Sequence, residues 1–184
     1  MSIAKMSGQY VCLLQFFGLV AICMTYKLHP VITPDIPSNT NLTTAPFVRI
    51  AYGFYFFEVN KQKNWFDSYQ TCRCMDAELI SIETIDEWYE INRYIRAMNI
   101  EHLYWTSGTD LAKEGAHIWF ANGQPINIDI WAKGQPDNAG KSEHCHELGW
   151  KTNHTSGLND RPCTFPSRYI CEARQPITAS FVIW

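Results

Sequence analysis

Five side chains that can offer oxygen ligands gather in two short stretches of the last third of the chain. They are Gln135, Asp137, Glu143, Asn159 and Asp160. A hard dication such as Ca²⁺ takes about six to eight oxygen ligands, from carboxylates and amide carbonyls alike. The backbone carbonyl of Asp160 could add a sixth, and water or ligand hydroxyl groups the rest. The pattern therefore predicts a calcium site, provided that Cys145 and Cys163 close the gap between the stretches.

Pro136 has a specific use between two of these ligands. If the Gln135-Pro136 bond is cis, the side chains of Gln135 and Asp137 can turn toward the same point. The plain alternative is a chance turn in a polar surface loop. The downstream Asn159-Asp160 pair and its flanking cysteines favour the metal site over that alternative.

A second motif, His144-Cys145-His146, could suggest zinc or copper. On a strand the two imidazoles share one face, but no further soft ligand is nearby in the sequence, so we interpret them as surface histidines. No set of nucleophile, base and orienting group is visible either. The prediction is a binding protein and not an enzyme.

Composition supports an ordinary globular domain. The 184 residues are 46% hydrophobic and 18% charged, with a formal net charge of -3 and a pI near 6.0. No basic field exists to attract nucleic acid.

The N-terminus predicts secretion to the extracellular space. Residues 1–24 combine Lys5 with a short apolar run and are interpreted as a signal peptide rather than a membrane anchor. Residues 25–46 are rich in Pro, Thr and Asn and predict a linker; residues 47–174 predict the domain, and 175–184 a tail. Sequons at Asn41 and Asn153 could accept glycans.

Five cysteines remain after cleavage, which predicts two disulfides and one odd thiol in an oxidising compartment. Cys74 lies two residues from Cys72 on a predicted helix, so these two are not expected to bond to each other. An intermolecular disulfide through Cys74 and a buried or capped thiol stay open as alternatives.

Periodicity predicts two helices among short strands. Asn64 caps a helix that runs to Met75, and Thr84 opens a second that carries an apolar face from Ile85 to Met98. The expected strands are 54–59, 78–83, 103–105, 117–120, 147–150 and 168–171. Residues 121–143 predict a long loop that needs disulfides and a metal to hold it.

These motifs together resemble a C-type lectin domain over residues 47–174, most closely the secreted galactose-binding C-type lectins of insects. The features that carry the resemblance are Trp65-Phe66, Ala77-Glu78-Leu79, Trp105-Thr106-Ser107-Gly108, Trp119, Gly134 to Asn138, Glu143-His144-Cys145, Leu158 to Cys163 and Tyr169 to Glu172. The resemblance implies an α+β fold, the C-type lectin-like fold, with two helices beside small antiparallel sheets and a long calcium-binding loop. It also implies the disulfides Cys72–Cys171 and Cys145–Cys163.

The same resemblance implies a calcium-dependent lectin for galactose- or GalNAc-type glycans, on glycoproteins or on microbial surfaces as in innate immunity and agglutination. Gln135 and Asn159 would donate to sugar hydroxyls, and Asp137 and Glu143 would accept from them, while Asp160 would hold the metal. Strong galactose binders often place an aromatic ring after Gln-Pro-Asp, where this chain has Asn138; Trp131 and Trp150 are substitute candidates. The alternative function is a module that binds a protein partner without sugar.

Overall fold

The computed structural model describes two units of the chain, and each is presented by itself. The described residues are 29–33, 45–100, 102–152, 155–174 and 178–182. One unit spans Asn41–Arg174, and the other combines Met1–Thr40 with Gln175–Trp184. The predicted signal peptide and the sequons at Asn41 and Asn153 lie outside the described residues. The domain boundaries stay predictions.

The smaller unit contains one antiparallel strand pair. Strand β1 (His29–Thr33) pairs with β11 (Thr178–Val182), so that Val31 faces Ser180. Both strands lie in segments that the sequence predicted as a linker and a tail. The sequence did not predict this pairing, because neither segment alternates apolar and polar residues.

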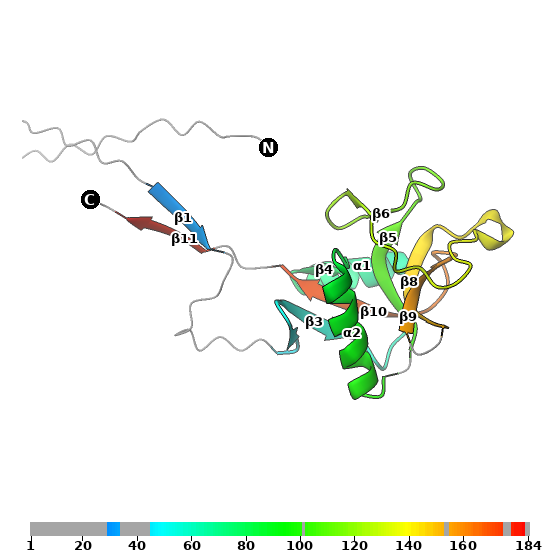
Figure 1. Cartoon of the computed structure of the whole chain (residues 1–184), viewed down its shortest axis with the longest axis horizontal. Coiled ribbons are helices and arrows are strands. Elements are labelled where there is room, and N and C mark those ends of the chain that lie inside the picture. The colour runs from blue at the N-terminus through cyan, green and yellow to red at the C-terminus, as the bar shows by residue number, and fades with distance from the viewer. Residues whose placement is uncertain (1–28, 34–44, 101, 153–154, 175–177, 183–184) are drawn as a thin grey trace, which may run out of the picture. The chain divides into compact units, whose positions relative to one another are not determined.

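The larger unit contains two helices and, among the described residues, a sheet of nine strands (Figure 1). The helices are α1 (Trp65–Cys74) and α2 (Ile85–Ala97), with the single-turn 3-10 helix η1 (Ala139–Lys141) in the long loop. The strands are β2 (Val48–Ile50), β3 (Gly53–Phe57), β4 (Ala77–Leu79), β5 (Tyr104–Thr109), β6 (Ile118–Trp119), β7 (Gln124–Pro125), β8 (Cys145–Thr152), β9 (Thr155–Arg161) and β10 (Arg168–Ala173).

Both helices begin at the predicted caps. The side chain of Asn64 accepts a hydrogen bond from the Asp67 N–H at 2.8 Å, and Thr84 accepts from the Glu87 N–H at 3.1 Å. The Glu87 carboxylate also accepts from the Glu83 N–H at 2.9 Å, which satisfies a further donor at the start of α2. Local side-chain chemistry therefore sets where each helix begins.

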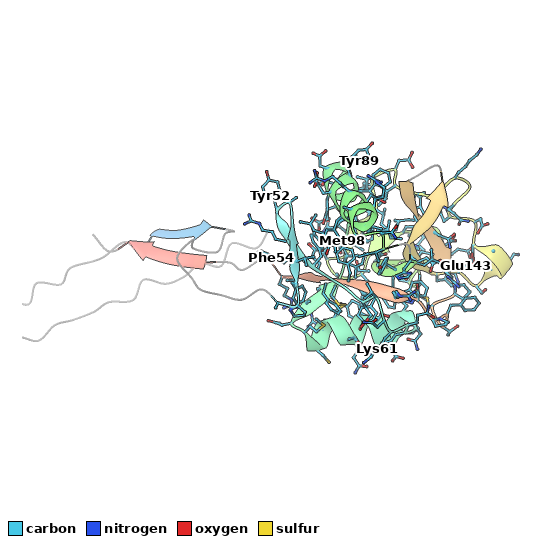
Figure 2. All side chains as sticks on the ribbon, turned by 90° about the horizontal axis from the view of Figure 1, so that it is seen from below. Tyr52, Phe54, Lys61, Tyr89, Met98 and Glu143 are labelled. Carbon is cyan, nitrogen blue, oxygen red and sulfur yellow. A yellow bond between two sulfur atoms is a disulfide. The ribbon has the colours of Figure 1, made fainter. Side chains whose placement is uncertain are left out.

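The buried stripe of α2 is shorter than the sequence predicted. Ile91 and Ile95 are buried, whereas Ile85 and Met98 are 38% and 55% exposed. Figure 2 shows Tyr89, another exposed residue of α2, at the edge of the larger unit. Trp88, Ile91 and Ile95 pack in or against the core, so only the two ends of the predicted stripe stay in solvent.

The sheet is mixed, because β10 pairs with β3 and β4 in antiparallel fashion and with β5 in parallel. This pairing brings the C-terminal strand into the centre and places β5, β8 and β9 beside the long loop. A core of buried aliphatic and aromatic side chains, among them Ile80, Ile91 and Leu148, lies beneath α2. The predicted α+β architecture is confirmed, with one parallel pair added.

Both predicted disulfides are present. Cys72 in α1 is bonded to Cys171 in β10, with Cα atoms 5.4 Å apart. Cys145 is bonded to Cys163, with Cα atoms 5.1 Å apart, and this bond closes the β8–β9 hairpin. Cys74 is exposed and unpaired in the described part of the chain. Of the two alternatives for this thiol, burial is therefore wrong.

Candidate functional site

Three of the five predicted ligands meet at one point. Carboxylate oxygens of Asp137, Glu143 and Asp160 lie within 4.8 Å of one another. Asp137 follows a cis Gln135–Pro136 bond, Glu143 lies between η1 and β8, and Asp160 is on β9. We call these three residues the carboxylate cluster; Figure 2 labels Glu143, which lies beside η1 at one edge of the larger unit.

The carboxylate cluster also accepts hydrogen bonds from the backbone of the loop that carries it. The buried Asp160 carboxylate accepts hydrogen bonds from the Asp137 and Asn138 N–H groups at 3.1 and 2.7 Å. Glu143 accepts from the Ala139 N–H at 3.0 Å, and its own N–H donates to the Asn138 side-chain oxygen at 3.0 Å. These bonds arrange the segment from Asp137 to Glu143, which buries almost no apolar surface of its own.

The electrostatics of the carboxylate cluster favour a cation. Burial raises the pKa of Glu143, and the charges of Asp160 and Asp137 raise it further, against the hydrogen bond from Ala139. Like charges at this distance repel, and a dication would remove that repulsion. A set made only of oxygen donors fits Ca²⁺ rather than a soft metal.

The other two predicted ligands are next to the carboxylate cluster in the sequence: Gln135 forms the cis bond that precedes Asp137, and Asn159 precedes Asp160 on β9. The Gln135 Oε1 atom is buried and has no hydrogen-bond partner among the residues that the structure describes. A buried acceptor left unpaired costs free energy, and a bound cation or a water molecule would satisfy this oxygen. Asn159 is buried on β9, and its Nδ2 donates to Glu147 Oε1 at 3.4 Å. Because Nδ2 donates to Glu147, the carbonyl oxygen is the atom of this amide that can bind a cation.

Two residues that support Asn159 were missed by the sequence reasoning. Glu147 is fully buried in β8 and faces Asn159 across the strand pair. Arg161 Nη1 donates to both carboxylate oxygens of Glu147 at 3.0 Å. Burial raises the pKa of Glu147, and Arg161 opposes that rise. Period-two alternation placed Arg161 on the face of Asn159, and this signal could have identified the pair.

The prediction of surface histidines is wrong for His146, which is fully buried in β8. No further soft ligand is near this motif in the sequence, but in the fold Asp110 and His117 offer ligand atoms within 4.8 Å of a His146 ring nitrogen. His117 lies 29 and Asp110 lies 36 residues earlier in the chain than His146, and the pairing of β5 with β8 brings Asp110 close to His146. Sequence distance concealed this second cluster.

The aromatic substitute proposed for sugar stacking has another role. The Trp131 ring packs edge-on against His117 and His146, with ring centroids 5.0 and 4.9 Å apart. Asn138, Ala139 and Gly140 after Asp137 contribute no ring. The Trp150 side chain lies outside the described part of the structure.

Comparison with known proteins decides the family. Residues 61–173 match the model of the Lectin C-type domain. The chain is 40% identical over 154 residues to C-type lectin 37Da of Drosophila melanogaster, which covers 80% of this chain and 82% of that protein.

The chain belongs to the C-type lectin family.

Further relatives and structures agree with this family assignment. C-type lectin mosGCTL-7 of Aedes aegypti is 27% identical over 134 residues, which cover 70% of this chain and 89% of that protein. The C-type lectin domain of murine dendritic cell inhibitory receptor 2, solved in complex with an N-glycan, has a TM-score of 0.60 at 23% identity; the match covers 71% of this chain and 97% of that one. This structure supports the fold alone.

Family membership confirms two predictions. The fold is that of a C-type lectin domain, and the family is non-enzymatic, so the chain is not an enzyme. C-type lectins generally depend on calcium. Within the residues that the structure describes, no helix has both the length and the apolarity to cross a bilayer.

Proposed function

We propose that this C-type lectin holds one Ca²⁺ ion in the carboxylate cluster and binds galactose- or GalNAc-type glycans through that ion. The observation that carries the proposal is the convergence of Asp137, Glu143 and Asp160 within 4.8 Å. Gln135 and Asn159 complete the proposed ligand set with their carbonyl oxygens. Support comes from the orphaned Gln135 Oε1, for which a bound cation supplies a partner.

The sugar contacts follow from which atoms donate and which accept. Two neighbouring sugar hydroxyls would coordinate the ion, donate to the carboxylates of Asp137 and Glu143, and accept from the amides of Gln135 and Asn159. The order of amide before Pro136 and acid after it resembles galactose-type members of the family. Because Trp131 packs on histidines, the proposed galactose preference rests on Gln135 and Asp137, and Trp150 stays the candidate for a stacking ring.

Calcium titration by calorimetry tests the metal part of the proposal. The purified chain is expected to bind one Ca²⁺, and Asp137→Asn is expected to weaken binding at least tenfold, because it removes one of three carboxylates. Asp129→Asn is the matched control, since Asp129 is an exposed acid of the same loop outside the carboxylate cluster. Equal affinities for the two variants would show that the ion lies elsewhere.

Exchange of the two polar residues around Pro136 tests the sugar part. The double variant Gln135→Glu, Asp137→Asn keeps one acid and one amide but reverses their order. On a glycan array in Ca²⁺ the unmodified chain should select galactose-type glycans, and the double variant should lose them and gain mannose-type glycans. An unchanged sugar profile would contradict the assigned roles.

Two further proposals complete the function. The predicted signal peptide supports secretion. The two disulfides support it as well, because disulfides form and persist in an oxidising compartment. The exposed Cys74 supports a disulfide-linked dimer. Two sites in one molecule would raise the avidity for glycans on a microbial surface, provided that both can bind at once.

A second candidate function is the binding of a protein partner without sugar. It is favoured by an apolar hollow of about 430 Å³ beside α1. Its lining includes Phe66 and Phe120, which are about half exposed, together with Tyr69 and Leu111. Exposed aromatic side chains at a hollow are typical of protein interfaces. A glycan array without any signal that EDTA removes would favour this alternative, whereas signals that disappear with EDTA favour the lectin.

A further inference from the structure

A second cluster of ligand atoms lies outside the carboxylate cluster. We call it the histidine cluster, and it consists of Asp110, His117 and His146. The His117 Nδ1 atom is 3.2 Å from His146 Nε2 and 3.9 Å from Asp110 Oδ2. Asp110 directly follows β5, His117 directly precedes β6, and His146 is on β8, so the sheet itself positions the three side chains.

His146 is buried in a way that packing alone does not explain. Its side chain is fully buried, and its Nδ1 atom has no hydrogen-bond partner among the described residues. Its Nε2 atom faces a second imidazole nitrogen. Burial lowers the pKa of His146 to about 3, so the ring is neutral at physiological pH. The neutral imidazole is the form in which histidine binds metals, and the nitrogen that faces His117 and would bind the ion is Nε2.

Gly108 gives this ring its space. A Cβ atom at position 108 would lie 2.5 Å from His146 Nδ1 and 2.9 Å from its Cβ. Every residue with a side chain would therefore collide with the imidazole. Glycine weakens a strand interior, so its presence in β5 is explained by the ring that it accommodates.

We propose that Asp110, His117 and His146 bind a Zn²⁺ ion. Two imidazole nitrogens and one carboxylate oxygen form a ligand set typical of zinc, while calcium takes oxygen ligands alone. Zinc–nitrogen bonds of about 2.0–2.1 Å in a tetrahedron place two ligand nitrogens about 3.3 Å apart. The observed 3.2 Å between His117 and His146 matches this value. Water or a ligand group would fill the fourth position.

Neighbouring groups orient the carboxylate of this site. The second oxygen of Asp110, Oδ1, is 2.9 Å from His144 Nδ1, and the Gly115 N–H donates to Oδ2 at 2.8 Å. Such outer partners fix the direction of ligands in metal sites. Bound zinc would tie the segment between Asp110 and His117 to β8, and would stabilise the folded chain.

Zinc titration of the full chain tests the proposal. The protein is stripped with chelator, saturated with Ca²⁺ to fill the carboxylate cluster, and titrated with Zn²⁺ by calorimetry and with Co²⁺ by visible absorbance. One Zn²⁺ per chain is expected, with Co²⁺ bands of a tetrahedral site and a higher melting temperature. His117→Ala should weaken zinc binding at least tenfold and abolish the bands.

Two control variants make the result specific. His102→Ala removes a histidine outside the histidine cluster and should leave zinc binding unchanged. Asp137→Asn changes the carboxylate cluster and should also leave it unchanged, which separates this inference from the proposed lectin site. His117→Ala must retain calcium binding, and Asp110→Asn repeats the test in a variant that keeps the acceptor for Gly115.

Three results would overturn the inference. The first is no zinc uptake, which would reduce His117 and His146 to a hydrogen-bonded imidazole pair. The second is equal zinc affinity for His117→Ala, Asp110→Asn and the unmodified chain. The third is zinc binding that Asp137→Asn abolishes, which would place the ion in the carboxylate cluster.

Discussion

Arg161 holds the Glu147 carboxylate, to which the proposed ligand Asn159 donates a hydrogen bond. Glu147 is fully buried, and Arg161 donates to both of its carboxylate oxygens at 3.0 Å. Arg161→Met leaves that carboxylate without its cation. Removal of one partner from a buried pair costs about 3–5 kcal/mol, because the other charge stays uncompensated. Burial already raises the pKa of Glu147, so protonation limits the loss, and we expect about 3 kcal/mol.

Thermal unfolding and calcium titration measure this effect. For a chain of this size about 3 kcal/mol corresponds to a fall in melting temperature of about 6–12 °C. Calcium affinity should fall as well, because Asn159 loses the fixed carboxylate to which it donates. The matched control is Arg93→Met, which breaks the exposed ion pair with Glu90 and should change stability by less than about 1 kcal/mol.

A double variant decides whether the charge is the cause. Arg161→Met combined with Glu147→Gln removes both charges of this pair, and the neutral amide can still contact Asn159. It should recover most of the lost stability. If Arg161→Met unfolds at the temperature of the unmodified chain, or if the double variant is no more stable than Arg161→Met, the reasoning is refuted.

Two further predictions concern the pH dependence of folding and the state of the odd thiol. Burial, together with the charges of Glu87 and Glu83, raises the pKa of Glu172 to about 8, against the hydrogen bond from the Ser81 N–H at 3.3 Å. An acid with a raised pKa in the folded state contributes full stability below about pH 4.5, and this stability is lost as pH rises toward 8. Glu172→Gln should therefore be several kcal/mol more stable than the unmodified chain at pH 8 but not at pH 4.5, and a difference in unfolding free energy that does not change with pH would contradict this. Separately, the chain should migrate as a dimer on a non-reducing gel and Cys74→Ser as a monomer, and identical migration would exclude the proposed disulfide.

The helices were predictable because their signals are local. Asn64 and Thr84 cap α1 and α2 through residues three positions away, and these contacts need no knowledge of the fold. The burial of α2 was less predictable. Tertiary contacts leave Ile85 and Met98 exposed, although both continue the apolar stripe of Ile91.

The carboxylate cluster was predictable for a different reason. Its members lie within 24 positions of one another in the sequence. The disulfide between Cys145 and Cys163 joins the start of β8, just after Glu143, to the residues that follow Asp160. The histidine cluster was not predictable, because Asp110 and His146 meet only through the pairing of β5 with β8. His146 has no sequence feature that distinguishes it from a surface residue of an alternating strand.

The strand pair β1–β11 and strand β9 were also missed. β9 contains Gly157, Asn159 and Asp160, which are poor strand formers. A Cβ atom at Gly157 would lie 2.6 Å from the Ala132 backbone nitrogen, so the long loop crosses closely over β9 at this point. Tertiary packing, rather than local propensity, makes this segment a strand.

The central claim is that calcium in the carboxylate cluster mediates the binding of galactose-type sugars. Retention on immobilised galactose tests it most directly, with the purified chain loaded in Ca²⁺ and then washed with mannose, galactose or EDTA. We predict that the chain is retained on the column in Ca²⁺, that mannose leaves it bound, and that both galactose and EDTA release it. Passage through the column in Ca²⁺, or retention that EDTA does not reverse, would contradict it.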